Sequence, residues 1–149
     1  VDYITLIAGA GGQNRTLEVG KISTALKNLA KELKVPVIVL AQLNRGPTNR
    51  PDKRPRPSDI RDSGQIEQDA DVVMFVYREE YYLSKTEPEP GTPEHDAWQT
   101  KHDAVRGRAE VIIAKQRHGP TGTVQLAFEA QYTRFGNLAR ADYLPERME

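Results

Sequence analysis

The chain of 149 residues carries 21 Lys and Arg residues against 21 Asp and Glu residues, so net charge gives no argument for or against a nucleic-acid partner. It contains no cysteine, which excludes a disulfide framework and thiolate metal sites. No apolar run approaches the roughly 20 residues needed to cross a bilayer, and no signal-peptide pattern opens the chain. These properties predict a cytoplasmic protein without a membrane partner, forming one domain or part of one.

The N-terminal third predicts a strand, a loop and a helix. Val1–Ile7 is mostly apolar and predicts a strand that begins without an initiating Met, so we interpret the chain as a fragment. The glycine-rich residues 8–14 predict a loop. In Thr16–Lys34, apolar residues recur every three or four positions, which predicts a helix with one apolar face. Pro36 disfavours helical geometry in the residue before it and ends this helix.

Three short apolar runs predict the centre of a sheet. They are Val37–Ala41, Val72–Tyr77 and Ala109–Ala114, and runs of this kind are typical of strands buried on both faces of a parallel sheet. Val124, Leu126 and Phe128 alternate with polar or small residues, which predicts a closing antiparallel hairpin with one buried face. The predicted fold is therefore α/β, a mainly parallel sheet with flanking helices and a closing antiparallel hairpin.

Two segments interrupt this pattern. Arg45–Pro57 holds four prolines and five basic residues against one acid, and we expect a mobile basic loop that forms neither helix nor central strand. Glu79–Arg108 is mostly acidic and contains proline and Trp98, and we expect partial order there. The tail after Asn137 is polar and charged and predicts a surface extension.

Polar residues follow two of the predicted strands, where open α/β sheets bind their ligands. Lys115 and Arg117 come directly after Ala109–Ala114 and precede a Gly-Pro turn. Arginine presents a planar fork of donors that matches phosphate oxygens, so Arg117 fits an arginine finger supplied to a neighbouring site. The alternative is an ordinary pair of surface charges. Gln42 follows Val37–Ala41, and its amide could sense a γ-phosphate or merely satisfy backbone groups.

Two further candidates are an acid and a loop. Asp2 fits the strand-borne acid that helps to hold Mg²⁺ in a phosphate-hydrolysing site, with a surface Asp as the alternative. Arg61, Asp62 and Gly64 fit a DNA-contacting loop, because glycine lets backbone amides approach a phosphate closely. The same stretch has the pattern of a helix start, and both interpretations can hold together.

The histidines and exposed aromatic residues offer weaker signals. The three histidines lack metal-ligand spacing and are interpreted as solvated side chains. Tyr81, Tyr82 and Trp98 lie among acids that would repel a phosphate backbone, so we expect them to pack rather than to stack on bases.

These motifs, in this order, resemble the DnaB-type replicative DNA helicases over nearly the whole chain. The resemblance is carried by Asp2-Tyr3, Asn14–Glu18, Leu26–Leu33, Ser63–Asp71, Lys115–Pro120 and Arg134-Phe135. It implies the C-terminal part of a RecA-like motor domain, from the Walker B strand onward, within a homo-hexameric ring. That ring uses ATP and Mg²⁺ to move along single-stranded DNA and unwind the replication fork, with a primase and a helicase loader as expected partners.

By matching positions, the resemblance assigns roles to single residues. Asp2 resembles the Walker B aspartate that binds Mg²⁺, and Gln42 resembles the phosphate-sensing glutamine. Arg117, with Lys115, resembles the finger that reaches the neighbouring subunit's ATP. The residues that resemble those holding the DNA backbone are Arg61, Asp62 and Gly64. Residues 8–14 resemble a second loop facing the central channel.

The chain also departs from the family pattern. No Gly-x-x-x-x-Gly-Lys-[Ser/Thr] run is present, and the family's catalytic glutamate lies upstream of this chain. Residues 79–108 are longer than in the shorter family versions. We therefore expect residues 1–137 to be a truncated ATPase domain, followed by a tail of residues 138–149, and unable to hydrolyse ATP alone.

Two alternatives stay open. One is a RecA-like recombinase ATPase, which the helicase-like Ser58–Asp71 block disfavours. The other is a non-catalytic nucleic-acid-binding or docking module, in which the basic Arg45–Pro57 loop would bind phosphates without sequence choice and with strong salt dependence.

Overall fold

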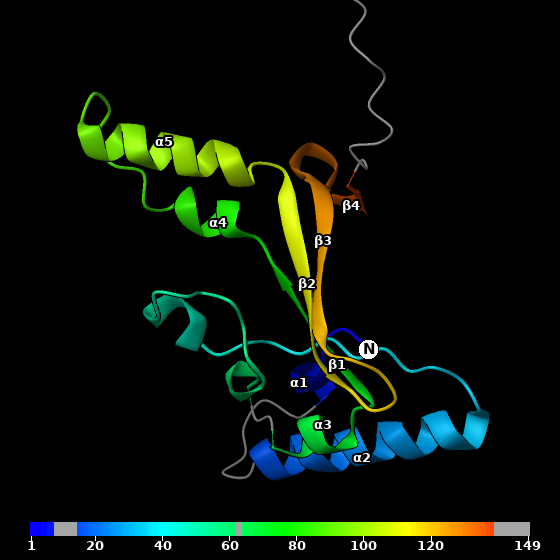
Figure 1. The fold of residues 1–149 in the computed structure, drawn as a ribbon. Helices are drawn as coiled ribbons and strands as arrows, with labels where there is room; N and C mark the ends of the chain where they lie inside the picture. Colours follow the sequence, from blue (N-terminus) through cyan, green and yellow to red (C-terminus); the bar gives the residue numbers. More distant parts are fainter. Residues whose placement is uncertain (8–14, 62–63, 139–149) are drawn as a thin grey trace, which may run out of the picture. The chain divides into compact units, whose positions relative to one another are not determined.

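The computed structural model describes residues 1–7, 15–61 and 64–138. They divide into two compact units: residues 1–75 with 113–121, and residues 76–112 with the described residues from 122 onward. Four strands form one sheet in the order β1 (Val72–Tyr77), β2 (Arg108–Gln116), β3 (Gly122–Glu129) and β4 (Arg134–Asn137) (Figure 1). The helices are α1 (Ile4–Ile7), α2 (Arg15–Leu33), α3 (Gly64–Asp69), α4 (Glu79–Leu83) and α5 (Pro93–Val105), with short 3-10 turns η1 (Gly46–Asn49), η2 (Pro57–Asp59) and η3 (Ala130–Tyr132).

The predicted helix over residues 16–34 is confirmed as α2. It ends where Lys34 takes a left-handed conformation with φ of 54°. The backbone N–H of Val35 then donates to the carbonyl oxygen of Ala30 at 3.2 Å. This is the six-residue closing bond of a Schellman end, and the proline that follows prevents the helix from continuing.

The core of the first unit forms against α2. Its fully buried side chains are Ile4 and Val19, and the partly buried residues packed against them are Ile22, Leu26, Val39, Ala41 and Ile66. Helix α3 lies alongside α2 (Figure 1). A Cβ on Gly20 would lie 3.3 Å from Cβ of Gln65, so the absence of a side chain at Gly20 allows this close approach.

Two of the predicted strands are not strands in the structure. Ile4–Ile7 is a helical turn, and residues 37–41 carry no strand assignment. They still lie side by side: the Val1 nitrogen donates to Ile38 at 2.8 Å, Leu40 donates to Val1 at 2.9 Å, and Ile4 donates to Leu40 at 2.9 Å. Ile38 is 76% exposed, so the predicted burial of this run on both faces is wrong. Val39 and Ala41, on the opposite side, contact the core.

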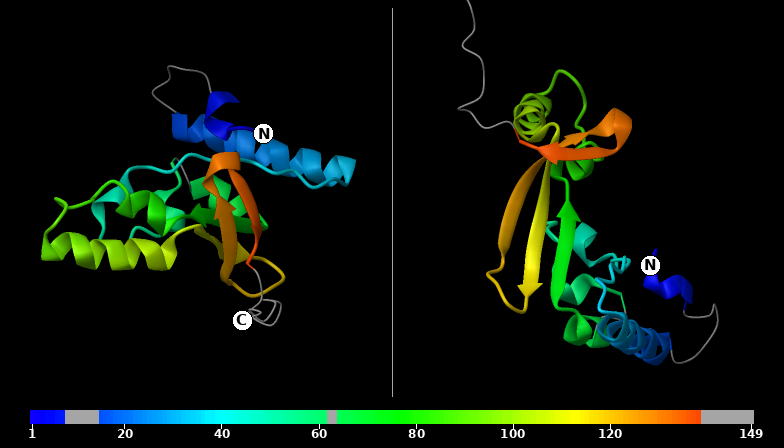
Figure 2. Two further views of the ribbon diagram at one scale, coloured as in Figure 1. Left: turned by 90° about the horizontal axis from the view of Figure 1, so that it is seen from above. Right: turned by 90° about the vertical axis from the view of Figure 1, so that its right-hand side faces the viewer.

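The four strands do not form the mainly parallel sheet that the sequence predicted. Strands β3 and β4 pair antiparallel, with Phe128 opposite Phe135, which confirms the closing hairpin. Strands β1 and β2 also run in opposite directions (Figure 2). The parallel arrangement was predicted from the apolar runs 37–41, 72–77 and 109–114. The first of these is not a strand, and the other two belong to neighbouring strands that run in opposite directions. An apolar run carries no information about the direction of its neighbour.

Strand β1 is also buried on one face rather than two, whereas residues 110–115 of β2 are all half-buried. In β1, Val73, Phe75 and Tyr77 are buried, whereas the alternate residues Val72, Met74 and Val76 are exposed. In β3, burial is limited to Phe128 near its end, so the predicted buried face of the hairpin is shorter than expected.

The excursion of residues 79–108, for which the sequence predicted partial order, contains the two helices α4 and α5. Thr92 caps α5 by accepting the backbone N–H of His95 at 3.2 Å, and Pro93 occupies the first helical turn. Trp98 donates its indole N–H to Leu83 at 3.0 Å and stacks on His102 with 4.9 Å between ring centroids. The expectation that Trp98 packs within the protein is confirmed.

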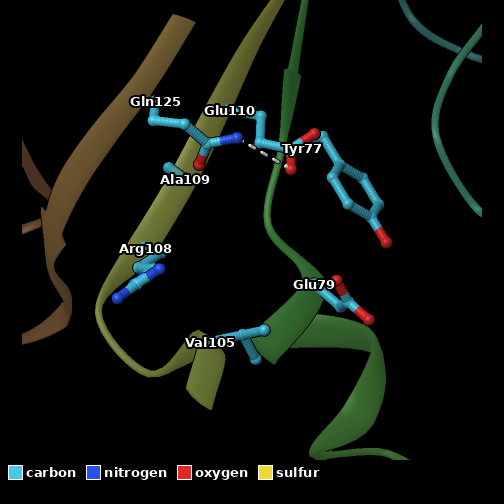
Figure 3. Close-up of a pocket in the computed structure, with 7 residues that line it drawn as sticks. All are labelled: Tyr77, Glu79, Val105, Arg108, Ala109, Glu110 and Gln125. Atoms are coloured by element: carbon cyan, nitrogen blue, oxygen red, sulfur yellow. Dashed lines mark hydrogen bonds between the residues drawn. The ribbon is translucent and has the colours of Figure 1, made fainter. Parts of the chain in front are cut away.

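A small cavity of about 190 Å³ lies in the second unit (Figure 3). Its lining consists of Tyr77, Glu79, Val105, Arg108, Ala109, Glu110 and Gln125. Gln125 donates an amide N–H to the Glu110 carboxylate at 3.1 Å, which joins β3 to β2 across the cavity wall. Among the described residues, none that the sequence singled out for chemistry lines this cavity.

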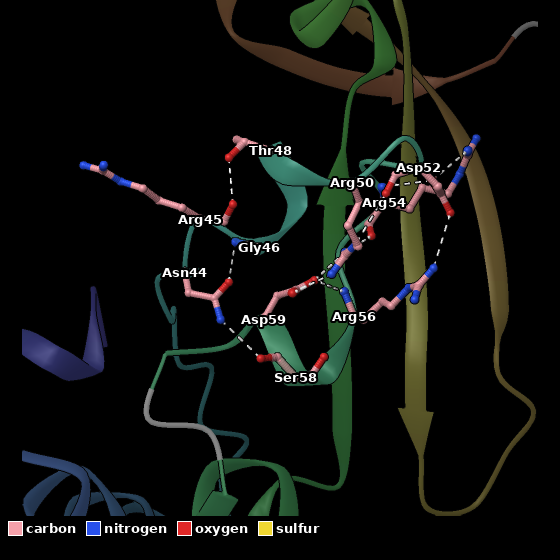
Figure 4. A network of polar contacts seen from close by, with 10 residues as sticks. All are labelled: Asn44, Arg45, Gly46, Thr48, Arg50, Asp52, Arg54, Arg56, Ser58 and Asp59. Carbon is pink, nitrogen blue, oxygen red and sulfur yellow. Dashed lines mark hydrogen bonds and ion pairs between the residues drawn. The ribbon is translucent and has the colours of Figure 1, made fainter.

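The basic segment of residues 45–57 is folded rather than an open loop (Figure 4). It contains η1 and leads into η2, so the prediction that it forms no helix is wrong. The Arg50 guanidinium donates two hydrogen bonds to the Asp59 carboxylate, at 2.8 and 2.7 Å. Asp59 is only 3% exposed. We call this ion pair the Arg50–Asp59 clasp. The acid lies two residues beyond the segment in which charges were counted, and for that reason the sequence prediction missed it.

Core packing around Val19 gives the first testable prediction. Val19→Ala removes two carbons from a fully buried position and should lower the free energy of unfolding by about 2 kcal/mol. Leu17, on the same helix, is 60% exposed. Leu17→Ala should change the free energy by less than about 0.5 kcal/mol. Urea titration measures both values, and equal losses would contradict this description of the core.

The clasp gives a pH-dependent prediction. The hydrogen bond from Arg50 lowers the pKa of Asp59, against the opposing effect of burial, and the Arg56 amide adds to the lowering. A carboxylate whose pKa is lowered on folding stabilises the protein above its unfolded pKa of about 3.9, and this contribution is lost as pH falls through the folded pKa. The difference in unfolding free energy between wild type and Asp59→Asn should be largest near neutral pH and shrink below about pH 4. A difference independent of pH would contradict it.

Candidate nucleotide and DNA site

Lys115 lies near the end of β2 and holds the end of a neighbouring helix. Its Nζ donates to the carbonyl oxygen of Glu67 at 2.6 Å and to that of Gln68 at 3.3 Å. These carbonyls belong to the last turn of α3, where backbone acceptors lack helical partners and the helix dipole favours a cation. The predicted phosphate-binding lysine is therefore engaged with α3 in this structure.

Arg117 lies just beyond β2 and is fixed against Asp71. Its backbone N–H donates to the Asp71 carbonyl oxygen at 2.8 Å. Its Nε lies 3.3 Å from Oδ1 of the same residue, and its side chain is 47% exposed. Because Nε is the guanidinium nitrogen nearest the chain, this contact orients the side chain and leaves the outer end of the fork available to a ligand.

Asp71 also accepts a hydrogen bond from Nζ of Lys27 on α2. The Lys27 contact is the main reason that the pKa of Asp71 lies below its ordinary value, against the opposing effect of burial, and the positive charge of Arg117 adds to the lowering. Asp71 therefore remains a carboxylate at neutral pH and joins α2 to the residues after β2. The sequence prediction gave Asp71 no role. Its position immediately before an apolar strand was the available signal.

Gln42 and Arg61 are brought together by the backbone. The N–H of Arg61 donates to the carbonyl oxygen of Gln42 at 3.0 Å. The next pair along, Leu43 and Ile60, forms an antiparallel bridge. Both Gln42 and Arg61 have exposed side chains. The residue predicted to sense phosphate thus lies directly beside a residue predicted to contact DNA.

The remaining predicted residues are less connected. Asp2 is exposed, and within the described part of the chain its carboxylate makes no hydrogen bond or ion pair with Gln42, Lys115 or Arg117. Gly64 is the first residue of α3, the helix whose other end receives Lys115. Asp62 and the glycine-rich residues 8–14 lie outside the described residues.

Metal-ligating clusters and membrane-spanning helices are both absent from the described residues. Across residues 1–7, 15–61 and 64–138, no three His, Cys, Asp or Glu side chains gather as a metal site would require. Among the helices of those same ranges, none is long and apolar enough to span a membrane.

Comparison with known proteins gives the same family in sequence and in structure. Residues 1–137 match the model of the DnaB-like helicase C-terminal domain. The chain is 50% identical over 139 residues to the replicative DNA helicase DnaB of Rickettsia conorii, covering 93% of this chain and 28% of that protein. It is 50% identical over 142 residues to the replicative DNA helicase DnaC of Bacillus subtilis, covering 94% of this chain and 28% of that protein.

Among solved structures, a DnaB-like replicative helicase, studied together with its interactions with primase, superposes with a TM-score of 0.73 at 43% identity. The match covers 93% of this chain and 30% of that one. The chain thus spans less than a third of the length of these curated relatives and of this helicase. With the family model matched over residues 1–137 and relatives near 50% identity, the chain belongs to the DnaB-like helicase C-terminal domain family.

Proposed function

We propose that this chain is the C-terminal part of the motor domain of a cytoplasmic, hexameric replicative DNA helicase that couples ATP hydrolysis to unwinding at the replication fork. The observation that carries the proposal is the placement of Arg117, held by Asp71 just beyond β2, in a chain whose relatives are replicative helicases. A recombinase or a docking module lacks comparable support, since neither occurs among these relatives.

In the proposed mechanism, Arg117 serves the ATP bound by a neighbouring subunit. Its guanidinium would stabilise the negative charge that develops on the transferring phosphoryl group. Lys115 would share this role only by exchanging its hydrogen bonds to Glu67 and Gln68 for phosphate oxygens. Gln42, exposed beside Arg61, would report the presence of the γ-phosphate to the DNA-contacting residues.

The described residues fit part of a site for ATP and Mg²⁺. Asp2 offers an exposed carboxylate, and Mg²⁺ is commonly held by one or two carboxylates together with phosphate oxygens and water. The cations of Lys115 and Arg117 suit phosphate. The 149 residues contain no phosphate-loop motif, so we propose that another part of the helicase supplies it and that this chain alone does not hydrolyse ATP.

The proposed partners follow from the same assignment. Arg61 and Gly64, with Asp62, would hold the backbone of single-stranded DNA. Among the similar structures is a helicase studied with its interactions with primase, which supports a primase as a partner here. A helicase loader is the other expected partner.

The trans role of Arg117 can be tested by complementation in the full-length helicase. Arg117→Ala should lower kcat for ATP hydrolysis by about 10³-fold, the effect of losing an arginine finger. Asp2→Ala should inactivate its own subunit's site. Mixed in equal amounts, the two inactive proteins should recover up to about a quarter of wild-type ATP hydrolysis, because an intact site on one subunit can face an intact finger on the next.

Arg134→Ala is the matched control. Arg134 is an exposed arginine on β4, paired with Glu129 at 2.7 Å, and lies outside the proposed site. Alone, this variant should hydrolyse ATP as the wild type does. If Arg117→Ala and Asp2→Ala stay inactive when mixed, Arg117 acts within its own subunit or is structural.

The DNA-contacting role of Arg61 predicts a change in salt dependence. Arg61→Ala should weaken oligo(dT) binding to the full-length helicase. The slope of log affinity against log salt should become shallower by about 0.7 for each phosphate that the variant no longer neutralises. Arg45→Ala, which removes an exposed cation from the basic segment, should leave the slope unchanged. The reverse result would favour phosphate binding by residues 45–57.

A further inference from the structure

Residues 42–61 form a closed loop whose two ends are joined. We call the paired ends, residues 42–44 and 59–61, the neck of the loop. There the backbone N–H of Asn44 donates to the carbonyl oxygen of Asp59 at 2.7 Å, and that of Arg61 donates to the carbonyl oxygen of Gln42 at 3.0 Å. These two bonds flank the antiparallel pair of Leu43 and Ile60. The Asn44 side chain adds a third bond, to the Ser58 carbonyl oxygen at 3.3 Å. The two candidate residues Gln42 and Arg61 are therefore the paired ends of one loop.

The Arg50–Asp59 clasp holds this loop from inside (Figure 4). Both carboxylate oxygens of Asp59 accept from Arg50, and Oδ2 also accepts the backbone N–H of Arg56 at 2.8 Å. Arg50 reaches further, to the Arg54 carbonyl oxygen at 2.9 Å. A buried carboxylate that loses its partner is strongly unfavourable, so the contact with Arg50 stabilises the closed arrangement of the loop.

The space around the carboxylate is limited by Gly46. A Cβ at this position would lie 2.7 Å from Oδ1 of Asp59 and 2.7 Å from Oδ1 of Asn44. Both distances are well inside van der Waals contact. The absence of a side chain at Gly46 therefore lets Asp59 sit at the neck, where its own carbonyl oxygen receives Asn44.

Most of the cations in this loop have partners within it. Besides Arg50, Lys53 donates to the carbonyl oxygens of Thr48 and Arg50, and Arg54 and Arg56 lie near the Asp52 carboxylate. Arg45 extends away from the network in Figure 4. These contacts stabilise the shape of the loop, while the side chains of Arg54 and Arg56 remain 42% and 58% exposed.

We propose that the Arg50–Asp59 clasp is a positioning device that keeps Gln42 and Arg61 in fixed register, so that it controls how strongly DNA stimulates ATP hydrolysis. Arg50 and Asp59 touch neither ATP nor DNA in this scheme. They act indirectly. Because Gln42 and Arg61 share a backbone hydrogen bond, a displacement of one residue moves the other as long as the neck stays rigid. This inference rests on the proposed helicase function and on the roles given to Gln42 and Arg61.

The test compares ATP hydrolysis by the full-length helicase with and without oligo(dT). In Asp59→Asn, the ratio of DNA-stimulated to basal rate should fall by about tenfold, because a small displacement of Gln42 or Arg61 from its working position is costly. Basal kcat and KM for ATP should stay within about twofold of wild type, because the clasp does not contact the nucleotide. A merely structural role would lower the basal and stimulated rates by the same factor.

Two further variants make the result independent of one substitution. Gly46→Ala keeps every charge but pushes on the Asp59 carboxylate, and it should lower the stimulation ratio in the same way. Arg50→Lys keeps the charge but loses the bidentate fork, so its ratio should be intermediate. Arg45→Ala, in the same loop, is the control and should retain the wild-type ratio. If Asp59→Asn does not fold by circular dichroism, Gly46→Ala and Arg50→Lys decide the question.

The outcomes separate the clasp from the helicase assignment. Wild-type protein without any DNA-stimulated hydrolysis would overturn the proposed function and the clasp role with it. Normal stimulation in wild type and in all the clasp variants that fold would overturn the clasp role alone, as would equal loss of basal and stimulated rates.

Discussion

A buried carboxylate, Asp59, is the constraint on which the arrangement of residues 42–61 depends. Its oxygens receive the Arg50 fork and the Arg56 amide, and its carbonyl oxygen receives Asn44. Segments rich in proline and arginine lack the regular hydrogen bonds of helix or sheet, so their shape must come from other contacts. Here Asp59 provides those contacts, and the two ends of the segment are brought together as a result.

A second acid, Asp71, holds the residues around Lys115 and Arg117 in a similar way. It lies between Lys27 on α2 and Arg117 beyond β2, while Lys115 holds the last turn of α3. Some of the 21 basic and 21 acidic residues are thus paired with one another in specific ion pairs within the chain. Arg117 differs from Arg50 in that its contact uses one inner nitrogen and its side chain remains half exposed. That combination of orientation and exposure is the basis of the role proposed for Arg117.

Helix α3 links the two groups of candidate residues, Gln42 with Arg61 and Lys115 with Arg117. It begins at Gly64, three residues after Arg61, and its last turn receives Lys115. Close packing against α2 at Gly20 holds the helix in place. In the proposed ring helicase, ATP and DNA must influence each other across such connections, and this chain offers two: the neck between Gln42 and Arg61, and α3 between Gly64 and Lys115. Coupling of this kind travels through contiguous contacts, and both connections are made of such contacts within this chain.

The sequence by itself determined the family, the helix over residues 16–34 and the closing hairpin, because motif order, 3.6-residue periodicity and strand alternation are local properties. It also identified the residues proposed here for chemistry. Tertiary structure decided the direction of the strands, the exposure of Ile38 and the fold of residues 45–57. Each of these depends on which distant group lies opposite. An apolar run does not specify its neighbour's direction, and a cluster of arginines does not reveal that an acid just beyond it will occupy one of them.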